Sequence, residues 1–249
     1  PGMDADWYDD PNYSHGFLVP LIAGYFLIQN WPALKSTPLR PSNAGLLLII
    51  GSLVLLLLGY IGTEYFTMRS SLVFLLAGIV LYWFGWAVFR LASLSIAFLI
   101  FMVPLPYIVY DALAFPLKLL VTKASVAVLV ILSVPVVREG NIIMFPQTVL
   151  EVADACSGLR SLMSLVTLAV ALAFLTHKSA LKRTILICSA VPVAIMTNMF
   201  RVIATGVLAS RYGGAVAEGF FHEFAGFAVF ALAMVILFGE SALLKKVGR

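Results

Sequence analysis

The chain has 249 residues, of which 62% are hydrophobic and only 11% are charged. A soluble domain averages about 45–50% apolar and about 25% charged residues, so this composition excludes a water-soluble fold. The formal net charge is +4, but the 16 Lys and Arg residues are scattered between apolar runs rather than gathered in a basic stripe, which excludes a typical nucleic-acid-binding surface. The positive charges are better interpreted as signals of membrane topology.

Seven apolar runs approach the length of about 20 residues that a helix needs to cross a bilayer. In chain order they are Phe17–Trp31, Asn43–Ile61, Ser70–Phe89, Leu91–Tyr107, Leu159–Leu175, Arg183–Ala209 and Glu223–Leu244. An eighth run, Ala112–Val134, is ambiguous because Lys118 and Lys123 lie beside Pro116, and it either spans the membrane or lies partly in the interface. The predicted fold is an all-α, polytopic membrane helix bundle of about seven or eight transmembrane helices, forming a single domain over residues 1–249.

Charge separates two topologies. If Ala112–Val134 does not cross, the N-terminus lies outside and most Lys and Arg residues fall inside; if it crosses, three of those cations move outside. The positive-inside rule therefore favours the seven-span arrangement. Both arrangements put the connections that hold Cys156 and His222 on the outer side, because the basic segments Lys178–Arg183 and Lys245–Arg249 determine the orientation of the C-terminal half.

The segment from Val136 to Val152 has a different pattern. Glu139-Gly140-Asn141 is typical of a turn, and short β-branched and apolar runs lie on both sides of it. This pattern predicts a small β-hairpin on the extracytoplasmic surface. The segment leads directly into Ala155-Cys156-Ser157-Gly158, where another helix is expected to begin.

Cys156 is a candidate nucleophile because of this position. A thiol beside a helix N-terminus is in a partial positive field that favours the thiolate. The free backbone N–H groups of the first turn could also stabilise an oxyanion. The alternative is a small buried hydrophobic residue, which is what most free cysteines are. Cys188, within an apolar span, is predicted to be such a packing residue.

Arg201 is unusual because it lies in an otherwise apolar span. Burying a guanidinium at the centre of a bilayer costs about 2.5–3.5 kcal/mol even on lenient scales, so such residues usually face the interior of the bundle and have a function. Asn198, Arg201 and Thr205 fall at helical spacing and predict a polar stripe on one face. The alternative is that Arg201 extends along the helix to the outer headgroups.

His222 opens the last span and is a candidate proton shuttle, since an imidazole titrates near neutral pH. The alternative is an ordinary interfacial histidine. His15, in Tyr13-Ser14-His15-Gly16, is a rival base. A thiol, a proton shuttle and a cation are together the parts that acyl transfer requires. The sequence contains no metal-binding or nucleotide-binding motif, so no metal or cofactor is expected.

The sequence resembles the exosortase family, the multi-spanning bacterial relatives of archaeosortases. The resemblance rests on three motifs and covers nearly the whole chain. The motifs are Ala155-Cys156-Ser157-Gly158-Leu159-Arg160-Ser161-Leu162, Asn198-Met199-Phe200-Arg201-Val202, and His222 ahead of the last span. Supporting matches are Tyr13-Ser14-His15-Gly16, Met102-Val103-Pro104-Leu105-Pro106 and Gly140-Asn141-Ile142.

The resemblance implies a cysteine protease or transpeptidase of the bacterial cytoplasmic (inner) membrane, with its active site on the periplasmic side. Its partners would be exported proteins with a C-terminal Pro-Glu-Pro motif, a hydrophobic helix and a basic tail. Cys156 would be the nucleophile, Arg201 the stabilising cation and His222 the general acid/base. Residues expected to contribute to substrate binding are Ser157, Arg160, Asn198 and His15.

Two other functions fit the same residues. The first is a membrane acyltransferase that uses the Cys156 thiol on a lipid or glycan. The second is a non-enzymatic anion carrier whose pathway is lined by Asn198, Arg201 and Thr205. The natural substrate, the acceptor, the choice between hydrolysis and transpeptidation and the oligomeric state do not follow from the sequence.

Overall fold

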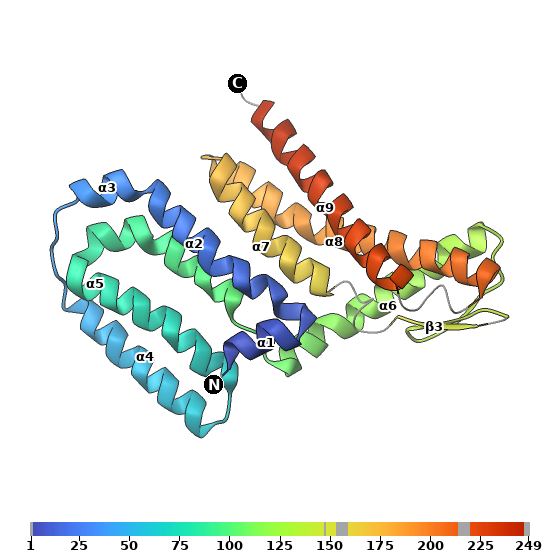
Figure 1. Ribbon diagram of the computed structural model, residues 1–249, viewed down its shortest axis with the longest axis horizontal. Helices are drawn as coiled ribbons and strands as arrows, with labels where there is room; N and C mark the ends of the chain where they lie inside the picture. Colours follow the sequence, from blue (N-terminus) through green and yellow to red (C-terminus); the bar gives the residue numbers. More distant parts are fainter. Residues whose placement is uncertain (1, 147, 153–158, 214–219, 247–249) are drawn as a thin grey trace. The chain divides into compact units, whose positions relative to one another are not determined.

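The computed structural model describes residues 2–146, 148–152, 159–213 and 220–246, most of which are helical (Figure 1). The chain divides into two compact units, Pro1–Val109 and Tyr110–Arg249. Five of the described helices are long and apolar enough to cross a bilayer, in agreement with the predicted helical membrane bundle. They are Ala44–Ile61, Tyr65–Met102, Tyr107–Ile131, Ala180–Tyr212 and Phe224–Lys246.

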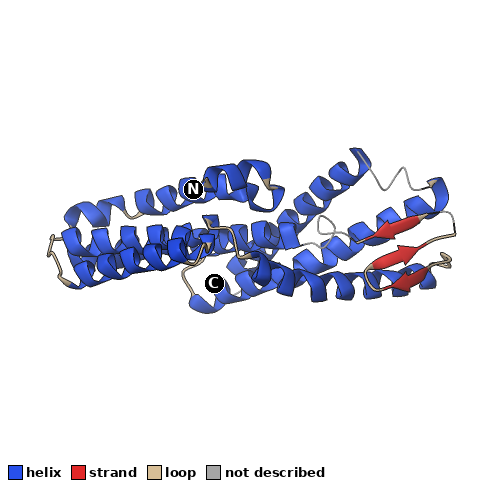
Figure 2. Cartoon of the chain, turned by 90° about the horizontal axis from the view of Figure 1, so that it is seen from below, coloured by secondary structure: helices blue, strands red, loops and turns tan. Residues whose placement is uncertain are grey.

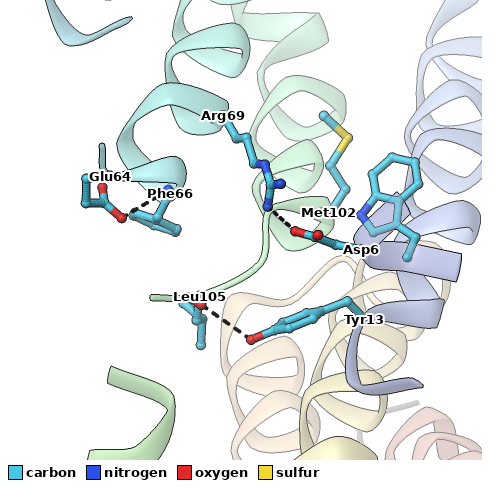
Figure 3. Close-up of polar contacts among 8 residues, drawn as sticks. Asp6, Tyr13, Glu64, Phe66, Arg69, Met102 and Leu105 are labelled. Carbon is cyan, nitrogen blue, oxygen red and sulfur yellow. Dashed lines mark hydrogen bonds and ion pairs between the residues drawn. The ribbon is translucent and has the colours of Figure 1, made fainter. Parts of the chain in front are cut away.

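The N-terminal unit consists of helices joined by short connections. In chain order they are α1 (Met3–Asp9), the 3₁₀ helix η1 (Pro11–Phe17), α2 (Leu18–Gln29), α3 (Trp31–Ser36), α4 (Ala44–Ile61), α5 (Tyr65–Phe98) and the 3₁₀ helix η2 (Leu99–Met102). Polar contacts hold the N-terminal segment against the rest of this unit. The carboxylate of Asp6 pairs with Arg69, the indole of Trp7 donates to the carbonyl of Met102, and the hydroxyl of Tyr13 donates to the carbonyl of Leu105 at 3.4 Å (Figure 3).

Helices α4 and α5 pack through small residues. The residues that α4 buries lie seven positions apart: Gly45, Ser52 and Gly59. On α5, Ser71 and Gly78 are buried at the same interval. A Cβ atom added to Gly45 would lie 2.3 Å from the backbone nitrogen of Tyr82, so the two helices are almost in backbone contact. Close approach through small residues is a common basis of helix association in membranes, where apolar side chains gain nothing by leaving lipid.

The long helix α5 contains a sharp kink at Gly85. This residue has φ 81° and ψ −178°, and a Cβ there would lie 1.8 Å from the carbonyl oxygen of Arg40. Only glycine adopts this conformation without strain. The two spans predicted as Ser70–Phe89 and Leu91–Tyr107 therefore separate at Gly85, a few residues before the expected position near Arg90.

The C-terminal unit contains several long helices and a small sheet. Its elements are α6 (Tyr107–Ile131), β1 (Val137–Glu139), β2 (Ile142–Met144), β3 (Val149–Glu151), α7 (Leu159–Thr176), α8 (Ala180–Tyr212) and α9 (Phe220–Lys246). Helix α6 continues through Pro116 for 25 residues. The ambiguous segment Ala112–Val134 is thus mostly one helix, and that helix is long and apolar enough to cross a bilayer.

The three strands form an antiparallel sheet in the order β1-β2-β3 (Figure 2). The predicted hairpin is confirmed, with its turn at Gly140, where φ is 61°. The third strand was not separated from the hairpin in the sequence interpretation; it follows a break at Pro146. Buried residues of the sheet, including Ile143, pack against Leu129 of α6 and Val202 of α8.

Helices α7, α8 and α9 form a three-helix bundle around a core of alanine and leucine residues. The core residues are Leu165, Ala169, Leu172, Ala173, Leu186, Ala190, Ala194, Ala233 and Leu237. At one end, the imidazole of His177 lies 3.0 Å from the hydroxyl of Ser241, and the hydroxyl of Ser189 donates to Glu240 at 2.6 Å. Because neighbouring helices of the bundle are antiparallel, the first turns of α7 and α9 lie toward the C-terminal half of α8.

Candidate active site around Arg201

Arg201 lies in the C-terminal half of α8, beside the third strand of the sheet. Together with Thr205 it lines a small hollow whose other wall is the end of β3, Leu150–Val152. The hollow has a volume of about 10 Å³, close to the minimum for one water molecule. Arg201 is half-buried, so the rest of the protein covers part of this residue.

A glycine of α9 accommodates this guanidinium. A Cβ added to Gly226 would lie 3.3 Å from Nη2, 3.4 Å from Cζ and 3.5 Å from Nη1 of Arg201. The planar group of Arg201 therefore lies against the bare backbone of α9. The structure thus brings β3 together with the consecutive helices α8 and α9.

The predicted polar stripe on α8 is formed by residues in two environments. Asn198 is buried, at 2% exposure, while Arg201 and Thr205 share the hollow beside β3. All three lie within one uninterrupted helix, as the spacing requires. The stripe therefore faces the protein over at least part of its length.

Neither the Cys156 segment nor the side chain of His222 belongs to the part of the chain that the structure describes. Cys156 and Ser157 lie outside the described residues. They are flanked by Val152, which lines the hollow beside Arg201, and by α7, which begins at Leu159. His222 belongs to the first turn of α9. Its side chain is likewise outside the described part, but four residues separate it from Gly226, so the two positions share one face of the helix.

Arg160 is exposed in the first turn of α7. Its predicted role in substrate binding stays a prediction. Cys188 differs from expectation, because its side chain is exposed on the surface of α8 rather than packed in the bundle. An apolar run of sequence does not distinguish a residue that faces protein from one that faces lipid, which explains the error.

His15 belongs to the N-terminal unit, in η1, where it is half-buried. Burial lowers the pKa of its imidazole, while hydrogen bonds with backbone groups of Phe101 and Asn12 act in the opposite direction. The net shift is downward, so His15 is neutral near pH 7. These contacts give His15 a structural role, and its role as a rival base stays a prediction.

Gly226 and the end of β3 were not found by sequence reasoning. A glycine within an apolar helix carries no chemical group, and the short run before Ala155 looked like half of a hairpin. The only available signal was position, since Gly226 lies one turn after His222. In the described part of the chain, no three His, Cys, Asp or Glu residues are close enough to bind a metal ion together.

Comparison with known proteins identifies a family. The model of the transmembrane exosortase family matches residues 7–239, which include both compact units and every candidate residue. The predicted resemblance is therefore confirmed. No curated protein and no solved structure matches the chain.

Proposed function

Because the chain belongs to the transmembrane exosortase family, we propose that it cleaves the C-terminal sorting signal of exported proteins with Cys156 as its nucleophile. Family membership gives it a transpeptidase-like role in the membrane and exported proteins with sorting signals as substrates. The finer proposal is a thioester intermediate on Cys156, with a Pro-Glu-Pro type signal as substrate. The match spans both units, so we treat residues 1–249 as one domain.

The observation that carries the proposal is the hollow around Arg201. Val152 lines this hollow, and Cys156 follows it by four positions in the sequence, a stretch that spans at most about 14 Å whatever its conformation. Gly226 contacts the guanidinium, and His222 precedes it by one helical turn. The last described residue before the cysteine segment, the arginine and the helical position of the histidine thus lie near one another, which supports the proposal that Cys156, Arg201 and His222 act together.

The length of α8 supports a site at the membrane surface. The helix has 33 residues, so it is about 50 Å long, whereas the hydrocarbon core is about 30 Å thick. If the core begins at Arg183, then Arg201 lies about 27 Å along the axis, near the opposite boundary. This position requires much less dehydration of the guanidinium than the middle of the bilayer. In the proposed topology, that boundary is the extracytoplasmic one.

The proposed reaction has two steps. The Cys156 thiolate attacks the scissile carbonyl, Arg201 stabilises the negative charge on the oxygen, and a C–S bond replaces the C–N bond. His222 gives its proton to the leaving amine. An acceptor amine or water then attacks the thioester, returns a proton to the neutral imidazole and releases the thiolate.

The test of this proposal is the variant Cys156→Ala, assayed with a substrate that carries a sorting signal. We expect the cleavage rate to fall by at least about 10³-fold, because the substitution removes the nucleophile. The protein should remain folded in the membrane, because the substitution does not alter the helix bundle. Cys188→Ala is the matched control, since its thiol is exposed on α8, and it should cleave normally. Processing at the normal rate by Cys156→Ala would refute the assignment.

The acyltransferase alternative uses the same thiol. The chemical identity of the group attached to Cys156 distinguishes it from the proposed peptidase. Mass spectrometry of the thioester captured by rapid acid quenching of the unaltered enzyme should find a peptide, not a lipid or glycan, attached to Cys156. The anion-carrier alternative gains no support from the described residues, because the hollow beside Arg201 has room for about one water molecule only.

A further inference from the structure

The outer edge of β3 has an arrangement that the reaction does not yet explain. The β2–β3 ladder is defined by two hydrogen bonds at its ends. The N–H of Phe145 donates to the carbonyl of Thr148 at 2.8 Å, and the N–H of Val152 donates to the carbonyl of Asn141 at 2.9 Å. Hydrogen-bonded pairs alternate along an antiparallel ladder, so the residues midway between these two pairs also bond to each other.

That middle pair is Ile143 and Leu150, which lie opposite each other in the register. Leu150 therefore uses its backbone groups on β2. Val149 and Glu151, on either side, direct their N–H and C=O groups away from β2. The outward edge of β3 thus carries two donors and two acceptors at the spacing of an extended peptide, and no described residue bonds to them through its backbone.

The other edge of the sheet is less open. On β1, Val137 and Glu139 pair with β2, so only Arg138 directs its backbone outward. The guanidinium of Arg138 also donates to the carbonyl of Gly140 at 2.9 Å. Val149 on β3 is 62% exposed, and among the described residues no backbone group of another segment bonds to the outward groups of β3.

The edge of β3 is continuous with the candidate active site. Glu151 and Val152 at its end line the hollow beside Arg201, and the chain reaches Cys156 four residues later. A peptide paired with β3 would therefore extend along the strand toward the arginine and the cysteine. An unpaired edge of this kind is usually protected in soluble proteins, because it binds any extended chain.

We propose that the extended part of the sorting signal binds to the outer edge of β3 as a fourth strand. This inference rests on the proposed function, and it names how the substrate is held. Val149 and Glu151 would exchange main-chain hydrogen bonds with alternate residues of the signal, and the scissile bond would lie beyond Glu151. Recognition through the backbone suits an enzyme that processes exported proteins of different sequence.

The first experiment uses the unaltered enzyme and synthetic sorting-signal peptides, each with one backbone N-methyl group. Methylation removes a donor and blocks the edge, and it is applied at the positions other than proline, which has no N–H. Among these positions kcat/KM should fall about tenfold or more at those in register with the edge, every second residue along the peptide, and stay near normal at those between them. Cleavage that depends on Cys156 but shows no such alternation overturns this inference alone. Cleavage that persists in Cys156→Ala overturns the proposed function and this inference with it.

The second experiment blocks the edge on the enzyme. In Val149→Pro the lost N–H points away from β2, so the β2–β3 ladder is retained, whereas a strand partner loses its acceptor site. Arg138→Pro makes the same change on the opposite edge and is the matched control. We expect kcat/KM to fall about tenfold in Val149→Pro and to stay near normal in Arg138→Pro, with similar thermal unfolding of both proteins in detergent. Equal cleavage by the two variants overturns the inference.

Discussion

The α4–α5 hairpin and the α8–α9 contact both depend on glycine, but they use it for different purposes. At Gly45 the missing side chain admits the backbone of Tyr82, whose nitrogen would lie 2.3 Å from an added Cβ. At Gly226 it admits the guanidinium of Arg201, whose nearest atom would lie 3.3 Å away. Backbone cannot move without separating two helices, whereas a flexible side chain can shift by a few tenths of an ångström. Substitution should therefore cost stability at the first contact and activity at the second.

The largest effect is expected at Gly45. Gly45→Ala should lower the free energy of unfolding by about 3 kcal/mol, at the upper end of the usual cost of overpacking, because the clash is with backbone. Gly51→Ala is the matched control on the same helix, since an added Cβ there has no neighbour within 4 Å. It should be neutral or stabilise by about 0.5–1 kcal/mol through helix propensity. Thermal unfolding in detergent measures both, and equal stability of the two variants would contradict the packing argument.

The next largest effect is expected at Arg201. Arg201→Lys keeps the positive charge but loses the planar group that lies against Gly226, and with it the capacity for bidentate hydrogen bonds. We expect kcat/KM to fall about 100-fold, equivalent to about 2.7 kcal/mol, with little change in stability. Arg211→Lys, in the exposed last turn of the same helix, should cleave normally. Full activity of Arg201→Lys would mean that charge alone suffices.

Much of the fold was predictable because membrane helices and turns leave patterns in the sequence. The apolar runs predicted the helices, and Gly140 with its β-branched neighbours predicted the hairpin turn. The boundary between two spans was predicted near Arg90, a few residues after the kink at Gly85, because the close approach of the Arg40 carbonyl to Gly85 is a tertiary contact that the local sequence does not reveal. The prediction that Cys188 is packed in the bundle was wrong for a similar reason. Apolar residues are favoured both in the protein interior and on the surface that faces lipid, so an apolar run does not separate the two.

The candidate site was only partly predictable. Arg201 stood out because a charge is rare in an apolar span, and the roles of Cys156 and His222 came largely from the family resemblance. Arg201 is surrounded by Gly226 and by the end of β3, and neither has a distinctive chemistry of its own. They matter through the close approach of segments separated by tens of residues, which no local pattern encodes.

The smallest effect is expected at Gly226. It tests whether this glycine serves a different purpose from Gly45. Gly226→Ala should displace the guanidinium slightly and lower kcat/KM about tenfold, since a misplacement of 1 Å at a reacting group costs about 100-fold. Gly239→Ala adds the same methyl group to α9 where an added Cβ has no neighbour within 4 Å, so its activity should be normal. If Gly226 acts by positioning Arg201, the methyl group should cost much less in an Arg201→Lys background, because the group it displaces is already gone. Equal losses in both backgrounds would show that Gly226 affects the bundle as a whole, and the glycine would then serve the same structural purpose as Gly45.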